Sequence, residues 1–210
     1  VIQLANTGKF LGYFTSNKSK LTPQQMFLKL IYTKEQEKKS ELLNTLPSTF
    51  SNVFVDTNGT AYSTCMGIGD DLLKKHSTNG TNMLGNVKTS SALTDVTANK
   101  DGIIYASDSH GMIWVYTSQG EVIFQLGAEA ADKDISGLFT SLTTIAVDNS
   151  GNIWTADGEK GYLQSFTPTE YATTIFKALK EYENGDYKEA LTDWNYVLRP
   201  VSYTHLTLPT

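Results

Sequence analysis

The sequence has few cysteines, no excess of basic residues and no long apolar run, and each lack excludes a class of protein. Cys65 is the single cysteine among 210 residues, which excludes an internal disulfide. The chain has 17 lysines and arginines against 22 aspartates and glutamates, with no basic block, so nucleic acid is not an expected partner. No apolar run approaches the ~20 residues of a membrane span, and no signal-peptide pattern is visible.

What the chain does have is a repeated strand-and-turn pattern, in residues 53–62, 96–105 and 145–154. Each copy is a short apolar strand, an Asp/Asn-rich turn closed by glycine, and a second strand with an aromatic residue at the same offset. The glycines are Gly59, Gly102 and Gly151, and the aromatic residues are Tyr62, Tyr105 and Trp154. The glycines recur at roughly 40–50 residues, the spacing of propeller blades. A single unit of this kind cannot bury its faces, so the repetition predicts blades stacked around an axis.

The repeats resemble those of the NHL-repeat, TolB-like six-bladed β-propellers. The copy from Asp95 to Asp108 carries the resemblance best, and the third copy keeps Asp148 and Asp157. In the first copy Cys65 or Met66 stands where the second aspartate is expected, and residues 1–14 read as the last two strands of an earlier blade. The resemblance implies a mainly β fold over residues 1–167: a partial propeller of about three blades plus a remnant.

Residues 22–46 interrupt the strand pattern with two short amphipathic helices. Thr22 and Pro23 form a helix start, and Thr33 with Gln36 forms a second capping box. The first helix has an apolar stripe, consisting of Met26, Phe27, Leu30 and Ile31. We expect these helices to pack on the propeller rim, and the alternative is a helix that binds a membrane surface or a partner.

Residues 168–199 predict a helical hairpin that resembles a tetratricopeptide repeat around its turn. We expect a seam in which three residues of the second helix face three of the first, namely Tyr187, Ala190 and Trp194 against Ile175, Leu179 and Tyr182. Such repeats need neighbours. The far side of the second helix is therefore a candidate interaction surface, with Trp194 and Val197 as its residues.

The combination of propeller and helical hairpin is similar to a group of exported bacterial proteins that often carry a C-terminal Yip-type membrane domain. This resemblance covers roughly residues 1–199 and implies an extracytoplasmic, membrane-associated full-length protein with a possible membrane tether. Residues 200–210 resemble a translated sequencing adapter and are expected not to be native.

Loops that lead from the second to the third strand of a blade are the candidate ligand face. The candidate residues in these loops are Asp108, Ser109, His110, Asp157 and Glu159. The Ser-Asp-Ser-His run at 107–110 suggests hydrolysis, but four neighbours in one loop cannot supply a convergent nucleophile, base and acid. The structural reading is that Asp108 holds its loop through side-chain hydrogen bonds.

No residue is assigned to a metal or a cofactor. Asp148, Asn149 and Asn152 have the spacing of a hairpin turn rather than of a calcium loop. The predicted function is a non-enzymatic binding scaffold that presents a loop face and a helical surface to a protein or carbohydrate partner. The alternative is a metal-dependent lactonase- or lyase-like propeller enzyme whose ligands lie partly on other blades.

Overall fold

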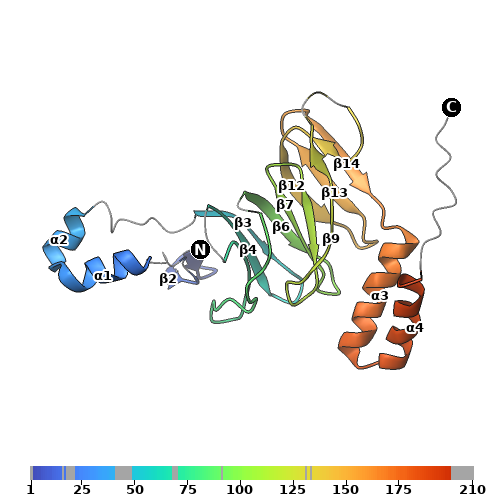
Figure 1. Cartoon of the computed structure of the whole chain (residues 1–210), viewed down its shortest axis with the longest axis horizontal. Helices are drawn as coiled ribbons and strands as arrows, with labels where there is room; N and C mark the ends of the chain where they lie inside the picture. The colour runs from blue at the N-terminus through green and yellow to red at the C-terminus, as the bar shows by residue number, and fades with distance from the viewer. Residues whose placement is uncertain are drawn as a thin grey trace.

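Antiparallel sheets follow one another along the chain, with helices before and after them, in this computed structural model (Figure 1). It describes residues 2–15, 17, 22–40, 49–67, 71–90, 92–130, 132 and 134–199. The N-terminal elements are β1 (Ile2–Leu4), β2 (Phe10–Tyr13), α1 (Pro23–Ile31) and α2 (Lys34–Lys39). The C-terminal helices are α3 (Glu170–Asn184) and α4 (Tyr187–Val197).

Three sheets form the body of the protein. The first sheet contains β3 (Thr49–Val55), β4 (Ala61–Met66) and β5 (Leu73–His76). The second contains β6 (Leu93–Ala98), β7 (Ile104–Asp108), β8 (Ile113–Tyr116) and β9 (Val122–Leu126). The third contains β12 (Leu142–Val147), β13 (Ile153–Asp157) and β14 (Tyr162–Phe166). A short parallel pair, β10 (Ala128–Glu129) with β11 (Leu138–Phe139), lies in the connection between the second and third sheets.

The sheets are arranged as blades. Strand β3 contacts β6, and β6 contacts β12, so the first strands of the three sheets lie next to one another. The strands of each sheet then follow outward in sequence order, each antiparallel to the one before. This mainly β arrangement is that of part of a β-propeller, as the repeats predict.

The three repeated glycines close equivalent turns between the first two strands of each sheet. Gly59, Gly102 and Gly151 have φ angles of 81°, 82° and 84°, a region that glycine enters without steric cost. In the third sheet the Asp148 Oδ1 atom accepts hydrogen bonds from the Ser150 and Asn152 amides at 2.8 and 3.0 Å. Asp56 and Asn99 do the same in the other two turns, so local side-chain chemistry fixes all three turns.

A β-bulge recurs at one position in the first strand of every sheet. The pairing register shifts between Phe50 and Asn52, between Leu93 and Asp95, and between Leu142 and Thr144. The bulges make Asn52, Asp95 and Thr144 equivalent positions. Tyr62, Tyr105 and Trp154 are also equivalent to one another. Each is the second residue of its strand and belongs to the second residue pair from the turn.

The core lies between consecutive sheets. One cluster of buried residues joins the first and second sheets, and another joins the second and third. Tyr62 and Tyr105 are 1% exposed, whereas Trp154 is 43% exposed. The Trp154 ring is exposed because no further sheet covers the outer face of the third sheet among the described residues.

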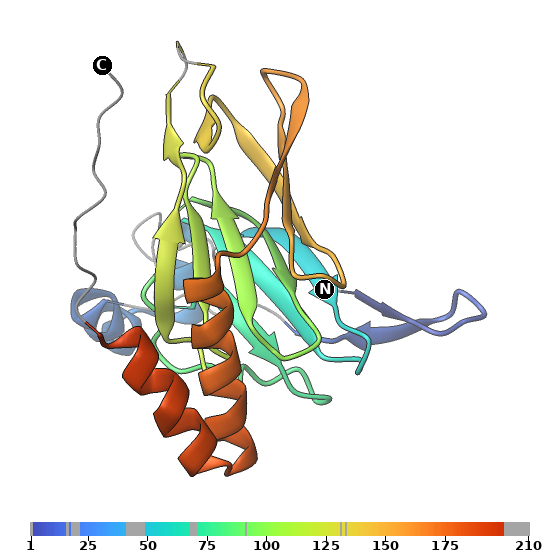
Figure 2. The same cartoon turned by 90° about the vertical axis from the view of Figure 1, so that its right-hand side faces the viewer.

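The N-terminal elements do not pack as expected. Helix α1 begins with the predicted Thr22 and Gln25 capping box, but it has no buried residue. Its apolar stripe is exposed, with Leu30 at 84%, so the expectation that it packs on the propeller rim is wrong. The second expected helix is present as α2, while its apolar residues Leu42, Leu43 and Leu46 lie outside the described residues. The β1–β2 hairpin has exposed apolar residues and projects beside the first sheet (Figure 2).

Helices α3 and α4 form an antiparallel hairpin. Thr169 caps the start of α3, and Gly185 ends it in the left-handed conformation at φ 88°. The small residues Ala178 and Ala190 are buried where the helices approach each other. The rings of Tyr182 and Tyr187 meet edge to face beside the turn, at 5.4 Å between centroids. Both residues belong to the predicted seam and meet as expected, but their rings are exposed at the turn end of the hairpin.

The hairpin lies on the side of the sheets that carries the glycine turns. Phe176 of α3 packs against Phe124 of β9 at 5.9 Å, and the Lys180 Nζ atom binds an Asp101 carboxylate oxygen at 2.6 Å. Figure 2 shows α3 running below the second sheet. The hairpin is thus on the side opposite the predicted ligand loops, but it packs against the sheets rather than projecting away from them.

Candidate functional site

The β7–β8 loop is held together by the Asp108 carboxylate, which is buried. Its Oδ1 atom accepts hydrogen bonds from the backbone amides of His110 and Met112, both at 3.0 Å. Its Oδ2 atom accepts one from the Trp114 indole nitrogen, also at 3.0 Å. Both oxygens therefore serve the loop, which leaves Ser109 and His110 as its exposed side chains.

The β13–β14 loop uses Asp157 in a related way. The buried Asp157 carboxylate accepts hydrogen bonds from four backbone amides at 2.7–3.3 Å, those of Thr140, Ser141, Glu159 and Lys160. Burial acts to raise the pKa of Asp157, but these four donors hold it below its ordinary value. Asp157 therefore ties its own loop to the connection from the second sheet, while the Glu159 side chain stays exposed.

Strand register shows that these two aspartates occupy one position of the repeat. Leu93 pairs with Asp108, and Leu142 pairs with Asp157. In the first sheet the equivalent pair is Phe50 with Cys65, so Cys65 and not Met66 replaces the second aspartate. The Cys65 thiol is buried, and burial raises its pKa. A buried, protonated thiol is a poor nucleophile.

The structure brings together a buried Ser–His pair that the sequence does not indicate. The Ser63 Oγ and His76 Nε2 atoms are 2.7 Å apart, and His76 Nδ1 is 3.3 Å from the Gly80 carbonyl oxygen. Desolvation is the main cause that lowers the pKa of His76, and the nearby Lys74 charge also lowers it. Ser63 and His76 are closed to solvent, and the third partner is a carbonyl rather than an acid, so the pair lacks the access and the orienting carboxylate of a hydrolytic triad.

This pair belongs to a polar cluster that fastens the N-terminal segment to the first sheet. The Lys74 Nζ atom donates to Asn17 Oδ1 at 2.5 Å, and Asn17 Nδ2 donates to Cys65 Sγ at 3.2 Å. Phe14 meets the His76 ring edge to face, at 5.7 Å between centroids. The sequence could not signal this cluster, because its members come together only through strand pairing.

Asp95 joins the first strands of all three sheets. Its Oδ1 atom accepts from Asn52 Nδ2 at 2.5 Å, and its Oδ2 atom accepts from Thr144 Oγ1 at 2.5 Å. The amides of Val96 and Ile145 donate to the same carboxylate at 2.7 and 2.9 Å. With four donors and only 5% exposure, this carboxylate stabilises the fold rather than offering a ligand site.

A cavity of about 540 Å³ lies on the side of the glycine turns. All three turns and the facing side of α3 line it, including Asp56, Asp101, Asp148, Lys177 and Lys180. The sequence predicts ligand binding on the opposite side, at the β7–β8 and β13–β14 loops. It gives no indication of this cavity. Residues of α3 form one wall of this cavity.

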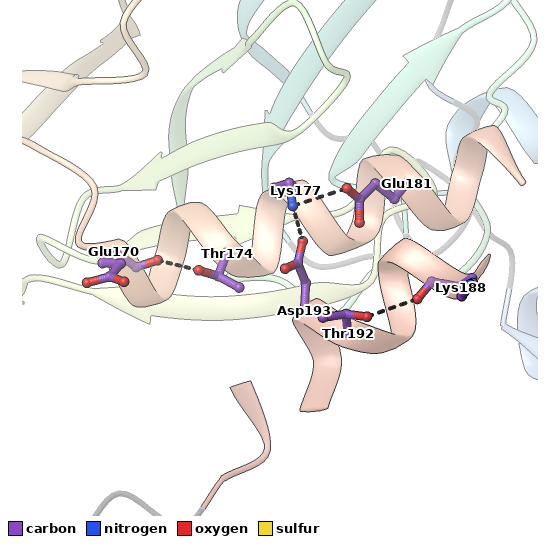
Figure 3. Close-up of polar contacts among 7 residues, drawn as sticks. All are labelled: Glu170, Thr174, Lys177, Glu181, Lys188, Thr192 and Asp193. Carbon is purple, nitrogen blue, oxygen red and sulfur yellow. Dashed lines mark hydrogen bonds and ion pairs between the residues drawn. The ribbon is translucent and has the colours of Figure 1, made fainter. Parts of the chain in front are cut away.

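The two lysines that α3 contributes to this cavity form ion pairs with Glu181, Asp193 and Asp101. Figure 3 shows Lys177 between Glu181 of α3 and Asp193 of α4, at N–O distances of 3.2 and 2.7 Å. Hydrogen bonds from Asn152 and then Trp154 lower the pKa of Asp148 to about 2. The lysines therefore hold the hairpin together and hold it against the turns.

The candidate interaction residues of α4 are less accessible than expected. Trp194 and Val197 are half-buried, whereas Leu191 and Leu198 are 60% and 75% exposed. The apolar surface that the sequence predicts on α4 is therefore present at different residues.

The part of the chain that the structure describes contains no cluster of three or more histidine, cysteine, aspartate or glutamate side chains that could hold a metal ion. Within the same residues, no helix combines the length and the apolar character needed to cross a bilayer.

Comparison with solved structures gives weak likenesses. A streptogramin B lyase superposes with a TM-score of 0.47 at 12% identity, covering 81% of this chain and 48% of the lyase. The computationally designed Ika4 protein gives 0.44 at 14% identity, covering 60% and 70% of the two chains. The WD40 β-propeller domain of Doa1 gives 0.42 at 10% identity, covering 61% and 40%.

None of these TM-scores reaches 0.5, so the propeller architecture rests on the chain's own strand pairing. No protein-family model matches the sequence. No curated protein matches it either.

Proposed function

We propose that this chain is a non-enzymatic binding module related to NHL-repeat propellers. Its β7–β8 and β13–β14 loops would bind a protein or carbohydrate partner, and the tetratricopeptide-like hairpin would offer a second surface. In the full-length protein the module would lie outside the cytoplasm and be associated with the membrane, as the resemblance to exported bacterial proteins implies.

This proposal rests on the hydrogen bonds that the two loop carboxylates accept. Asp108 and Asp157 are the acidic residues best placed for acid–base chemistry, and backbone amides engage both of them. A carboxylate whose oxygens already accept several hydrogen bonds is a weak base, and the same kind of donors lower the pKa of Asp157. The exposed side chains of these loops, Ser109, His110 and Glu159, are suited to reversible contacts with a ligand.

Arrays of glycans and peptides test the proposal, with the wild-type chain and two triple variants as probes. The loop variant is Ser109→Ala, His110→Ala and Glu159→Ala. The matched control is Thr57→Ala, Asn58→Ala and Lys100→Ala, which removes three exposed side chains from the opposite side. We expect at least tenfold weaker binding for the loop variant and unchanged binding for the control. Equal binding by all three proteins would contradict the assignment of the loop face.

Metal analysis separates this function from the enzymatic alternative. A lactonase- or lyase-like propeller would retain a divalent ion in its channel. A stoichiometric divalent ion that survives dialysis of the purified chain would overturn the non-enzymatic proposal.

A further inference from the structure

Tyr105 occupies the repeated aromatic position but lacks the hydrogen bond that its two equivalents make. In the first sheet the Tyr62 hydroxyl donates to Asp56 Oδ2 at 3.5 Å. In the third sheet the Trp154 indole nitrogen donates to Asp148 Oδ2 at 3.1 Å. The Tyr105 side chain is buried, and its hydroxyl has no hydrogen-bond partner among the described residues. A buried hydroxyl without a partner is costly unless another molecule binds it.

The residue that begins the second turn explains the missing bond. Asn99 stands where the other two turns have an aspartate, and its Oδ1 atom accepts hydrogen bonds from the Asp101 and Ile103 amides, both at 3.0 Å. The rest of its side chain is an NH2 group, which donates and does not accept. Burial, and then the Asp101 charge, raise the pKa of Tyr105 to about 12, so its hydroxyl keeps its proton. Tyr105 and Asn99 thus bring two donors to the cavity that both residues line.

A smaller apolar pocket of about 160 Å³ adjoins this cavity, and Tyr105, Pro168 and Phe176 line both spaces. Four aromatic and two aliphatic side chains form most of its wall, namely Tyr105, Phe124, Phe166, Phe176, Leu126 and Ile153. An apolar cavity of ~150 Å³ holds one benzene ring. Aromatic walls favour an aromatic occupant, because ring edges and faces attract one another. The pocket therefore has the size and the lining for a single aromatic ring.

We propose that this pocket and the two donors beside it bind a small uncharged aromatic compound that carries a carbonyl group. The ring of the ligand occupies the apolar pocket. Its carbonyl oxygen accepts hydrogen bonds from the Tyr105 hydroxyl and the Asn99 side-chain amide. The ligand thereby supplies the acceptor that an aspartate supplies in the other two turns.

The charges around the cavity favour an uncharged ligand. Lysines and aspartates line it in equal number, and these are Lys100, Lys177, Lys180, Asp56, Asp101 and Asp148. Neither an anion nor a cation therefore finds an excess of opposite charge, and either would lose hydration on entering. The walls of the apolar pocket lie within residues 105–176, on the side opposite the β7–β8 and β13–β14 loops. The site is thus separate from the function proposed for those loops, and its test is independent of that function.

The first experiment titrates three probes into the full chain and follows backbone amide shifts by NMR. Phenylacetamide has the ring and an uncharged carbonyl, phenylacetate has the ring and a charge, and toluene has the ring alone. We expect saturable binding of one phenylacetamide per chain, with the other two probes at least tenfold weaker. No saturable binding of phenylacetamide, or a comparison probe that binds as tightly, would overturn the proposal.

The second experiment repeats the titrations on variants that circular dichroism shows to be folded. Tyr105→Phe removes only the hydroxyl, and Asn99→Asp gives this hydroxyl an acceptor within the chain. Each should weaken phenylacetamide binding at least tenfold and leave toluene binding unchanged. Ala172→Leu adds carbon atoms at the pocket wall and should weaken both probes. Tyr62→Phe is the matched control, because Tyr62 is the equivalent residue and lines neither space, and it should bind like wild type. Wild-type affinity of Tyr105→Phe for phenylacetamide, or an equal loss in Tyr62→Phe, would refute the role of the hydroxyl.

Discussion

Replacing Asp95 tests whether a single buried carboxylate holds the three sheets in position. Asp95→Ala leaves four donors without their acceptor, those of Asn52, Val96, Thr144 and Ile145. Removing this acceptor should cost about 3–5 kcal/mol, since each buried donor left without a partner costs about 1–3 kcal/mol and relaxation keeps the total below the sum. Water entering the space left by the side chain can recover part of each lost bond, so we expect a value within this range rather than a sum over four bonds. Such a loss is a large share of the ~5–15 kcal/mol stability of a folded domain.

A second substitution distinguishes the loss of the carboxylate as an acceptor from the loss of side-chain volume. Asp95→Asn keeps the shape, and the Thr144 hydroxyl can turn to accept a hydrogen bond from the new amide. The Ile145 amide cannot, because it is only a donor, so one buried donor loses its acceptor. We expect a cost of about 1–3 kcal/mol, smaller than that of Asp95→Ala.

Urea unfolding followed by far-ultraviolet circular dichroism and tryptophan fluorescence gives these free energies. Glu159→Ala, in an exposed loop position, is the control and should change stability by no more than about 0.5 kcal/mol. An Asp95→Ala variant within about 1 kcal/mol of wild type would refute the reasoning, since a removed buried acceptor costs more than that.

Two further predictions concern the aromatic position of the repeat and its turn. Tyr105→Ala should cost about 3–5 kcal/mol in thermal or urea unfolding, whereas Trp154→Ala should cost only about 1–2 kcal/mol, and equal costs would contradict the burial difference. Asp148 should titrate near its pKa of about 2, and Asn152→Ala or Trp154→Phe should raise that pKa toward 3.8, as followed by NMR of the carboxyl carbon. Because the folded-state pKa is lowered, the stability that this carboxylate contributes is present above pH 3.8 and is lost as the pH falls toward 2. If Asp148 titrated at the same pH in both variants as in wild type, these hydrogen bonds would not be the cause of the lowered pKa.

The turns are the part of the fold that the sequence predicts best. Each needs only five consecutive residues: an Asp or Asn whose side chain accepts two nearby amides, and a glycine at positive φ. All the interacting atoms lie within four residues of one another, so the local sequence contains the whole interaction. The role of Asp108 in its loop was predictable for the same reason.

The polar contacts between strands and sheets could not be predicted in this way. Ser63 meets His76 through the register of β4 and β5, and a shift by one residue would place the two on opposite faces. Asp95 reaches Asn52 and Thr144 across 43 and 49 residues of sequence. Composition and periodicity carry no information on such distant pairs.

The sequence by itself therefore determined the number and type of the repeated units, their turns and the helical hairpin, because strand alternation, turn chemistry and helix capping are local. Only the tertiary structure decided which repeated residues are buried. Tyr105 and Trp154 occupy the same position of their units, yet one is enclosed and the other is 43% exposed. The difference lies in whether another sheet packs on that face, which depends on the neighbouring unit and not on the residue's own segment.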